Sequence, residues 1–224
     1  MKLFKAMATV AVLTSVSRVA GFVRDLMTAA FIGAGPISDA FFVALKLPNF
    51  FRRVTAEGAF SVSFVPIYSE TLEKEGQQEA EKFASDAFMI MFYGLSVFTV
   101  IALFAMPWVV KAIAPGFLGG SYRYELAVEL CRITFPYLVL MSLSALLGGA
   151  LNAVGRFAPF AIAPALFNVC LIIALLVRDW ALTPAHALAW GITISGVLQL
   201  IWLMISSARS GIRIKFVRPR MTPR

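Results

Sequence analysis

Apolar stretches long enough to cross a lipid bilayer recur along the whole of this 224-residue sequence. A transmembrane helix needs about 20 mainly apolar residues. Hydrophobic residues make up 60% of the chain and charged residues only 14%, whereas soluble domains carry about 25% charged residues. The recurrence argues against a soluble domain with a single anchor. The sequence therefore predicts an all-α polytopic membrane protein.

Six transmembrane helices are expected, with ends where polar residues, glycine or proline interrupt the apolar runs. The expected spans are residues 6–32, 38–66, 83–110, 126–151, 159–177 and 185–206. Residues 70–82 are expected to form an acidic, solvated loop, and Pro136 and Pro164 are expected to kink their helices. We expect one six-helix transmembrane unit over residues 1–206 and a basic cytoplasmic connecting segment over residues 207–224. The composition of that segment predicts further chain beyond it.

Lysine and arginine are distributed unequally between the two ends of the expected bundle. One side carries Lys2, Lys5, Lys74, Lys82, Arg156, Arg209, Arg213, Lys215, Arg218, Arg220 and Arg224, and the other carries Lys111, Arg123 and Arg178. Cytoplasmic loops are enriched in these cations, so both termini of this chain are predicted to be cytoplasmic. The basic residues lie beside apolar spans and form no nucleic-acid-binding motif, which argues against a nucleic-acid partner.

The first expected span carries charges where a simple membrane anchor would have none. Ser17 and Arg24 are seven residues apart on one stripe of the helix, and Arg18 and Asp25 share the adjacent stripe. Together they predict one broad polar face.

The second expected span repeats the pattern. Asp39, Lys46 and Arg53 recur every seventh residue, Pro48 and Arg52 lie among them, and Glu57 follows Arg53 by one helical turn. A charged side chain at the centre of a bilayer costs about 2.5–3.5 kcal/mol on insertion scales, so such a cluster is expected inside a bundle or a wet cavity.

Two interpretations of these charges differ in what they predict. Internal salt bridges, Asp25 with Arg18 or Arg24 and Asp39 with Lys46, would only fix helix register. Arg52 and Arg53 can also extend to the cytoplasmic interface. However, five cations (Arg18, Arg24, Lys46, Arg52 and Arg53) face only three acids (Asp25, Asp39 and Glu57). Arginine presents a planar fork that suits phosphate or carboxylate, so the excess favours a transporter of an acidic solute or lipid.

Other polar residues give weaker indications. Glu129 and Arg132 are predicted to form an interfacial pair, Asn168 can hydrogen-bond across helices, and His186 is expected in a loop or interface. Cys131 and Cys170 lack the spacing of metal ligands or of a disulfide framework. We expect no metal site, no cofactor and no catalytic group, and the coupling ion is unknown.

A series of ordered motifs resembles the MviN/MurJ family of lipid II flippases, part of the multidrug/oligosaccharidyl-lipid/polysaccharide exporter superfamily. The motifs are residues 17–25 (SRVAGFVRD), 33–35 (GAG), 39–49 (DAFFVALKLPN), Arg52 and Arg53, 56–60 (AEGAF) and 64–66 (FVP). Similar stretches follow at 114–117, 133–137 and 191–200. The resemblance covers nearly the whole chain.

The resemblance implies a V-shaped transporter of two six-helix lobes, of which this chain would supply only the N-terminal lobe. It implies movement of lipid II, an undecaprenyl-diphosphate-linked disaccharide peptide, from the cytoplasmic to the periplasmic leaflet of the bacterial inner membrane by alternating access. Arg18, Arg24 and Arg52 match the substrate-binding arginines of the family. Asp25, Asp39, Lys46, Arg53 and Glu57 are assigned gating or charge-pairing roles. The expected partners are lipid II, membrane lipids and the missing C-terminal lobe.

Two alternatives to a flippase are kept. One is a small-solute or drug antiporter of the same superfamily, against which the excess of cations counts. The other is a non-transporting membrane scaffold, in which the charges hold helices together. None of the three makes or breaks a covalent bond, so the chain is not expected to be an enzyme.

Overall fold

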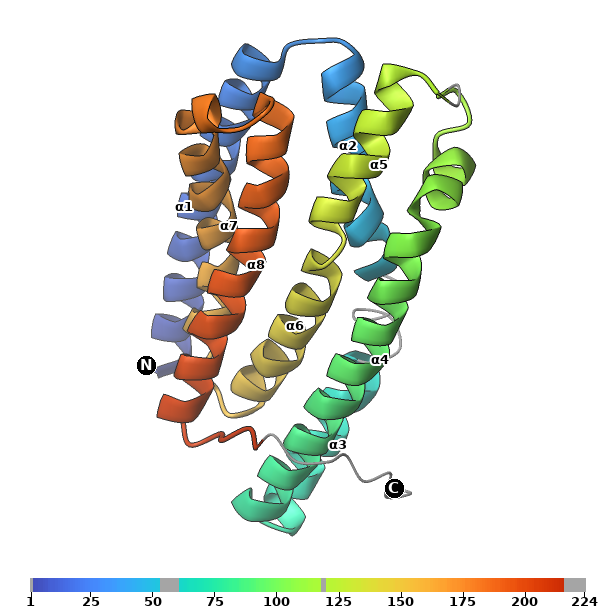
Figure 1. Ribbon diagram of the computed structural model, residues 1–224. Helices are drawn as coiled ribbons and strands as arrows, with labels where there is room; N and C mark the ends of the chain where they lie inside the picture. Colours follow the sequence, from blue (N-terminus) through green and yellow to red (C-terminus); the bar gives the residue numbers. More distant parts are fainter. Residues whose placement is uncertain (1, 53–60, 118–119, 216–224) are drawn as a thin grey trace.

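The computed structural model describes residues 2–52, 61–117 and 120–215, and their side chains except those of 2–7, 52, 61 and 62. These residues form helices that run back and forth along one direction, with no β-strand in the described ranges (Figure 1). The predicted all-α fold is confirmed.

The helices follow one another with short connections. In chain order they are α1 (Lys2–Ile32), α2 (Pro36–Arg52), α3 (Ser61–Lys74), α4 (Gln77–Ile113), α5 (Tyr122–Thr134), α6 (Tyr137–Ala153), α7 (Ala158–Leu176), the short 3-10 helix η2 (Arg178–Trp180) and α8 (Pro184–Arg209). The start of α1 and the end of α8 lie at the same end of the bundle, which we call the inner end (Figure 1). The opposite end is called the outer end.

Six passes between these ends account for the helices. Four passes are single helices, α1, α4, α7 and α8, while α2 with α3 and α5 with α6 each share one pass. Pro136 separates α5 from α6, because it lacks the N–H that would continue the helical hydrogen bonding. In the part of the chain that the structure describes, four stretches are long and apolar enough to cross a membrane: Gln77–Ile113, Tyr122–Ala153, Ala158–Leu176 and Pro184–Arg209.

The expected acidic loop over residues 70–82 is wrong. α3 continues to Lys74 and α4 begins at Gln77, so both flanks of the turn are helical. Lys74 donates to Glu70 at 2.7 Å, an i,i+4 pair that favours helix over loop. The acidic composition of these residues suits the exposed face of a helix as well as it suits a loop.

The residues just after α8 pack against the start of α4. Gln77 Nε2 donates to the carbonyl of Gly211 at 2.7 Å, and the Lys215 N–H donates to Ser85 Oγ at 3.0 Å. Ile212 between them is buried. The described part of the expected connecting segment is therefore attached to the bundle.

Two apolar clusters form the core of the bundle. The cluster toward the outer end joins α2, α4, α5 and α8 around Phe135 and Leu188, and the cluster toward the inner end joins α3, α4, α6 and α8 around Tyr68 and Leu147.

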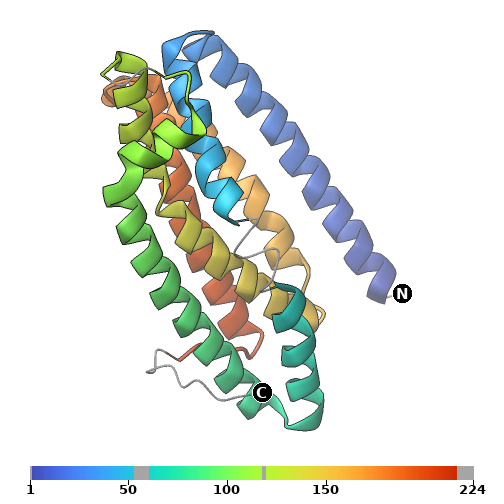
Figure 2. The ribbon, with the colours of Figure 1, turned by 90° about the vertical axis from the view of Figure 1, so that its right-hand side faces the viewer.

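Helix α1 lies at the edge of the outer cluster, which Met27 and Ile32 contact, and it packs mainly along α7. Figure 2 shows its N-terminal part diverging from α2 and α6. Ser17, Arg18 and Arg24, on the polar face of α1, line a cavity there.

Candidate functional site

A cavity of about 760 Å³ lies where α1 diverges from the bundle. Its walls come from α1, α2, α6, α7 and α8. The lining includes Thr14, Ser17, Arg18 and Arg24 of α1, Asn49 of α2, Tyr137 and Asn152 of α6, Phe160, Phe167 and Asn168 of α7, and Gln199 of α8. The described lining holds two arginines and no carboxylate, so its charge is positive.

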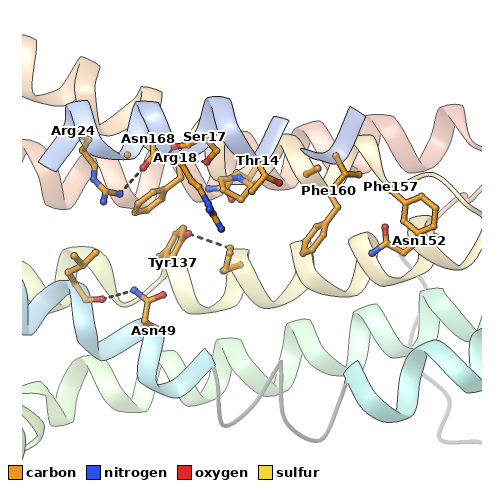
Figure 3. Close-up of a pocket in the computed structure, with 18 residues that line it drawn as sticks. Thr14, Ser17, Arg18, Arg24, Asn49, Tyr137, Asn152, Phe157, Phe160 and Asn168 are labelled. Carbon is orange, nitrogen blue, oxygen red and sulfur yellow. Dashed lines mark hydrogen bonds between the residues drawn. The ribbon is translucent and has the colours of Figure 1, made fainter. Parts of the chain in front are cut away.

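Arg18 extends from α1 into this cavity. Figure 3 shows its guanidinium in the space between α1 and α6, with Arg24 toward one end and Asn152, Phe157 and Phe160 toward the other. Within the described part of the chain, no ion pair or hydrogen bond engages the Arg18 side chain. Its donors are available to a ligand.

Arg24 is held on three sides. Its Nε and Nη2 donate to Asp25 Oδ1 at 3.0 and 2.7 Å, and its Nη1 donates to Asn168 Oδ1 at 2.7 Å. The guanidinium carbon lies 5.7 Å from the centre of the Phe167 ring, within the range of a cation–π contact. Of the two alternatives for Asp25, the structure pairs it with Arg24. The side chain of Arg24 is 23% exposed and that of Asp25 is 68% exposed, so the arginine is shielded from water while the acid is largely open to it.

Asn168 joins α7 to α1 and was identified from sequence only as a residue able to bond across helices. Its Nδ2 donates to the carbonyl of Ser17 at 2.9 Å, while its Oδ1 accepts from Arg24. Gly21 lies between these two partners, and a Cβ there would come 3.3 Å from Asn168 Nδ2. Ser17 and Arg24 thus share one face of α1, as their seven-residue spacing predicts.

A second cavity of about 490 Å³ adjoins the first on the other side of Arg24. Asp25, Thr28 and Ser38 line it, together with apolar residues of α1 and α2 such as Phe41. Arg24 lines both cavities and Asp25 only the second. Asp25 therefore contacts Arg24 from the side of the second cavity and does not line the cationic cavity.

The remaining charged candidates lie apart from this cavity. Asp39 pairs with Arg123 of the segment that begins α5, at 3.4 Å, and not with Lys46. Lys46 is exposed. Arg52 ends α2 but its side chain is not described, and Arg53 and Glu57 lie outside the described residues. The roles assigned to these residues, and to Arg18, Arg24 and Asp25, stay predictions.

The structure also changes the expected pairing of Glu129. Its Oε1 lies 3.3 Å from Nε2 of His186 on α8, whereas Arg132 donates through Nε to the carbonyl of Leu103 at 3.2 Å. No group of three or more His, Cys, Asp or Glu side chains placed to hold a metal occurs in the described part of the chain.

The fold and the cationic cavity define a class, a polytopic helical membrane protein with the architecture of a transporter lobe. Comparison with known proteins then gives the family. The model of the lipid II flippase MurJ family matches residues 28–224, and the chain belongs to that family.

The relatives are bacterial. A probable lipid II flippase MurJ of Rhizobium meliloti (strain 1021) is 40% identical over 229 residues, which cover 100% of this chain and 43% of that protein. The lipid II flippase MurJ of Burkholderia cenocepacia is 39% identical over 202 residues, covering 90% of this chain and 39% of that protein. The chain thus spans less than half the length of these relatives.

Solved structures agree with the fold. A lipid II flippase MurJ in an inward closed conformation has a TM-score of 0.76 and 27% identity, covering 93% of this chain and 42% of that one. A MATE transporter in complex with MaD3S has a TM-score of 0.73 at 17% identity, covering 97% of this chain and 49% of that one. The second match shows the shared fold alone.

Proposed function

We propose that this chain is one lobe of a lipid II flippase of the bacterial inner membrane, and that its cationic cavity receives the diphosphate of the lipid-linked precursor. The observation that supports it is that the described cavity lining contains two arginines and no carboxylate. A guanidinium is always charged and donates two parallel hydrogen bonds to phosphate oxygens. Arg18 and Arg24 take this role in the proposal, with Arg52 at the end of α2 as the third arginine.

The two described arginines have different roles in this proposal. Arg24 is already oriented by Asp25 and Asn168, so its position costs little additional side-chain entropy when a ligand binds. Arg18 is exposed and engaged by no described partner, so it can follow the ligand. The neutral hydrogen-bonding groups of Asn49 and Tyr137 lie on the opposite wall, where they suit uncharged polar groups of the ligand.

The size of the cavity supports a second lobe. Drug-sized ligands occupy pockets of about 300–1,000 Å³, and this cavity of about 760 Å³ falls in that range. A disaccharide peptide with its diphosphate is larger, so a facing lobe would enclose the remainder. Rocking of two lobes about a central site is the usual basis of alternating access. In this proposal both termini of the chain are cytoplasmic, so the inner end of the bundle faces the cytoplasm.

The experiment is to replace the arginines in the complete transporter and to measure the lipid II that reaches the outer leaflet. Arg18→Ala, Arg24→Ala and Arg52→Ala are each expected to lower that amount by about tenfold or more, since a hydrogen bond to a charged group contributes about 1.5–3 kcal/mol. Lys82→Ala is the matched control, because Lys82 is an exposed cation that pairs with Glu79 away from the cavity. Membrane insertion of each variant is checked by its abundance.

A charge swap separates the proposal from a scaffold. Arg24→Asp combined with Asp25→Arg keeps the ion pair on α1 but places a carboxylate at the position that faces the cavity. A cavity that binds diphosphate loses transport in this variant. Retained transport, or unchanged lipid II exposure in all three alanine variants, would exclude the arginine site.

A further inference from the structure

A third hollow lies on a different face of the bundle, between α4, α5 and the start of α8. It has a volume of about 660 Å³ and shares no lining residue with the cationic cavity. Glu125, Glu129, Arg132, His186 and Trp190 line it, with Tyr124, Leu182 and three further residues. It lies toward the outer end, where α5 and α8 begin (Figure 1). We call it the outer groove.

Arg132 is fixed in this groove by a defect in α4. Pro107 has no N–H, so the carbonyl of Leu103 four residues earlier has no helical donor. Arg132 Nε donates to that carbonyl at 3.2 Å, and Tyr124 donates its hydroxyl to the Pro107 carbonyl at 2.8 Å. The Arg132 Nη1 and Nη2 groups make no hydrogen bond or ion pair within the described part of the chain. A guanidinium with free donors is therefore held at a defined place.

Carboxylates flank this arginine on the side toward the outer end. Glu129 is three residues before Arg132 on α5, and Glu125 is one further turn toward the helix start. His186 lies beneath Glu129, with Nδ1 2.8 Å from Thr183 Oγ1 and Nε2 3.3 Å from Glu129 Oε1. The His186 side chain is 7% exposed, and its contact with Glu129 at 3.3 Å does not have the geometry of a hydrogen bond, so Nε2 makes no hydrogen bond within the described part of the chain. Glu129 thus lies beside a buried imidazole nitrogen that makes no hydrogen bond within the described residues.

Large apolar side chains at this level are directed outward. Trp190 in the groove is 53% exposed and Leu182 beside it is 83% exposed, while Trp180 just outside the groove is 91% exposed. Tryptophan is enriched where membrane proteins meet lipid headgroups. In a bilayer, the outer groove therefore opens toward lipid near the headgroup level.

We propose that the outer groove binds the headgroup of a phospholipid that carries a primary amine, such as phosphatidylethanolamine. The order of charges along α5 matches that of the lipid: the acids lie toward the outer end, where the ammonium is, and Arg132 lies one turn deeper, where the phosphate is. Residues three apart on a helix have Cβ atoms about 5–6 Å apart, a spacing that lets one headgroup reach both. Two acids against one arginine disfavour a purely anionic lipid. An ammonium with N–H donors suits carboxylates better than a quaternary amine does.

Trp190 provides a test of this site. In this 224-residue chain with Trp108, Trp180 and Trp202 replaced by Phe, Trp190 is the only tryptophan, and its fluorescence is quenched by brominated lipid that enters the groove. Nanodiscs of phosphatidylcholine receive a minor fraction of brominated phosphatidylethanolamine, phosphatidylcholine or phosphatidylglycerol. We expect an apparent association about fivefold stronger for the ethanolamine lipid, the size expected of one partly exposed ion pair. A matched chain that keeps only Trp180 reports bulk lipid and should show no preference.

Substitutions in the same background connect the preference to the carboxylates. Glu129→Gln and Glu125→Gln are each expected to reduce the preference, and Asp179→Asn, an exposed acid outside the groove, is expected to leave it unchanged. Thermal unfolding of each variant confirms folding. Equal quenching of Trp190 by the ethanolamine and choline lipids would overturn the proposal, as would strongest quenching by the glycerol lipid. This outcome does not depend on the diphosphate site, which shares none of these residues.

Discussion

Arg24 and Asn168, which lie 144 residues apart in the sequence, are joined by a hydrogen bond of 2.7 Å from the guanidinium Nη1 to the amide Oδ1. The same amide donates through Nδ2 to the Ser17 carbonyl at 2.9 Å. Since α1 packs mainly along α7, this side chain both attaches α1 to the bundle and sets the direction of Arg24. Asn168 is therefore a positioning residue for the cationic cavity.

Replacement of Asn168 by Leu is expected to weaken binding of a short-chain prenyl diphosphate by about tenfold, which corresponds to about 1.4 kcal/mol. The reason is that Arg24 loses the acceptor that holds it toward the cavity. Removal of the buried amide also leaves polar partners unsatisfied, which costs about 1–3 kcal/mol of stability. Ligand titration of the purified full chain gives the affinity, and thermal unfolding gives the stability.

Val169→Ala is the control for Asn168→Leu, because Val169 is the next residue on α7 and is 46% exposed on its outer face. It should change neither the affinity nor the orientation of Arg24. If Asn168→Leu lowers the unfolding temperature but leaves the diphosphate affinity unchanged, the amide only joins the helices and does not position Arg24.

The ion pair between Asp39 and Arg123 is expected to contribute little to stability. Its atoms are 3.4 Å apart and its side chains are 48% and 40% exposed, and exposed pairs of this kind contribute about 0.2–1 kcal/mol. A double-mutant cycle with Asp39→Asn and Arg123→Gln measures the coupling, and separates it from the contact of Arg123 with Phe117. The coupling should fall as salt is added. A coupling of zero at low salt would show that the pair does not connect α2 to α5.

Much of the fold follows from the sequence because the bilayer limits the chain to helices of known length. Residues 159–177 and 185–206 were expected as spans and correspond closely to α7 and α8. A kink was expected at Pro136, since proline removes a helical donor, and the structure ends one helix and begins another there. Residues 70–82 were misassigned because charge indicates exposure to water but does not separate a loop from the solvated end of a helix.

The contacts within the site are harder to predict from the sequence, since they depend on which helices are neighbours. The seven-residue spacing of Ser17 and Arg24 predicts their common face, but nothing in the sequence pairs α1 with α7, so the role of Asn168 was missed. Asp39 illustrates the same limit. Its expected partner Lys46 is on its own helix, whereas the structure pairs it with Arg123, 84 positions further along.

The Glu70–Lys74 pair gives a prediction of pH dependence outside the membrane spans. The hydrogen bond from Lys74, together with its charge, lowers the pKa of Glu70 below the usual value of a glutamate. The Glu70–Lys74 pair therefore stabilises the folded chain fully above the pKa that Glu70 has in the unfolded chain. This stabilisation is lost as the pH falls through the lower pKa that Glu70 has in the folded state. Titration of the Glu70 carboxyl carbon by NMR should show this low midpoint, and Lys74→Ala should return it toward the ordinary value. Lys82 pairs with Glu79, so Lys82→Ala should not move the midpoint of Glu70. An unchanged midpoint in Lys74→Ala would refute this cause.

Gly191 on α8 gives a test of helix packing beside the cavity. A Cβ at this position would lie 2.8 Å from the Cβ of Ala174 on α7, whereas a Cβ at Gly94 on α4 would meet nothing within 4 Å. Because α7 carries Asn168, a displacement of α7 from α8 also moves the wall of the cationic cavity. Gly191→Ala is expected to lower the free energy of unfolding by about 1–3 kcal/mol, the usual cost of overpacking.

Gly94→Ala is the matched control, and it should stabilise the chain by about 0.5–1 kcal/mol, since alanine is the better helix former where space is free. Both variants are compared by chemical unfolding in detergent, and diphosphate affinity is measured in parallel. Opposite signs of the stability change are expected, with weaker binding only in Gly191→Ala. If Gly191→Ala is as stable as the unsubstituted chain, α7 and α8 do not approach as closely as the structure has them.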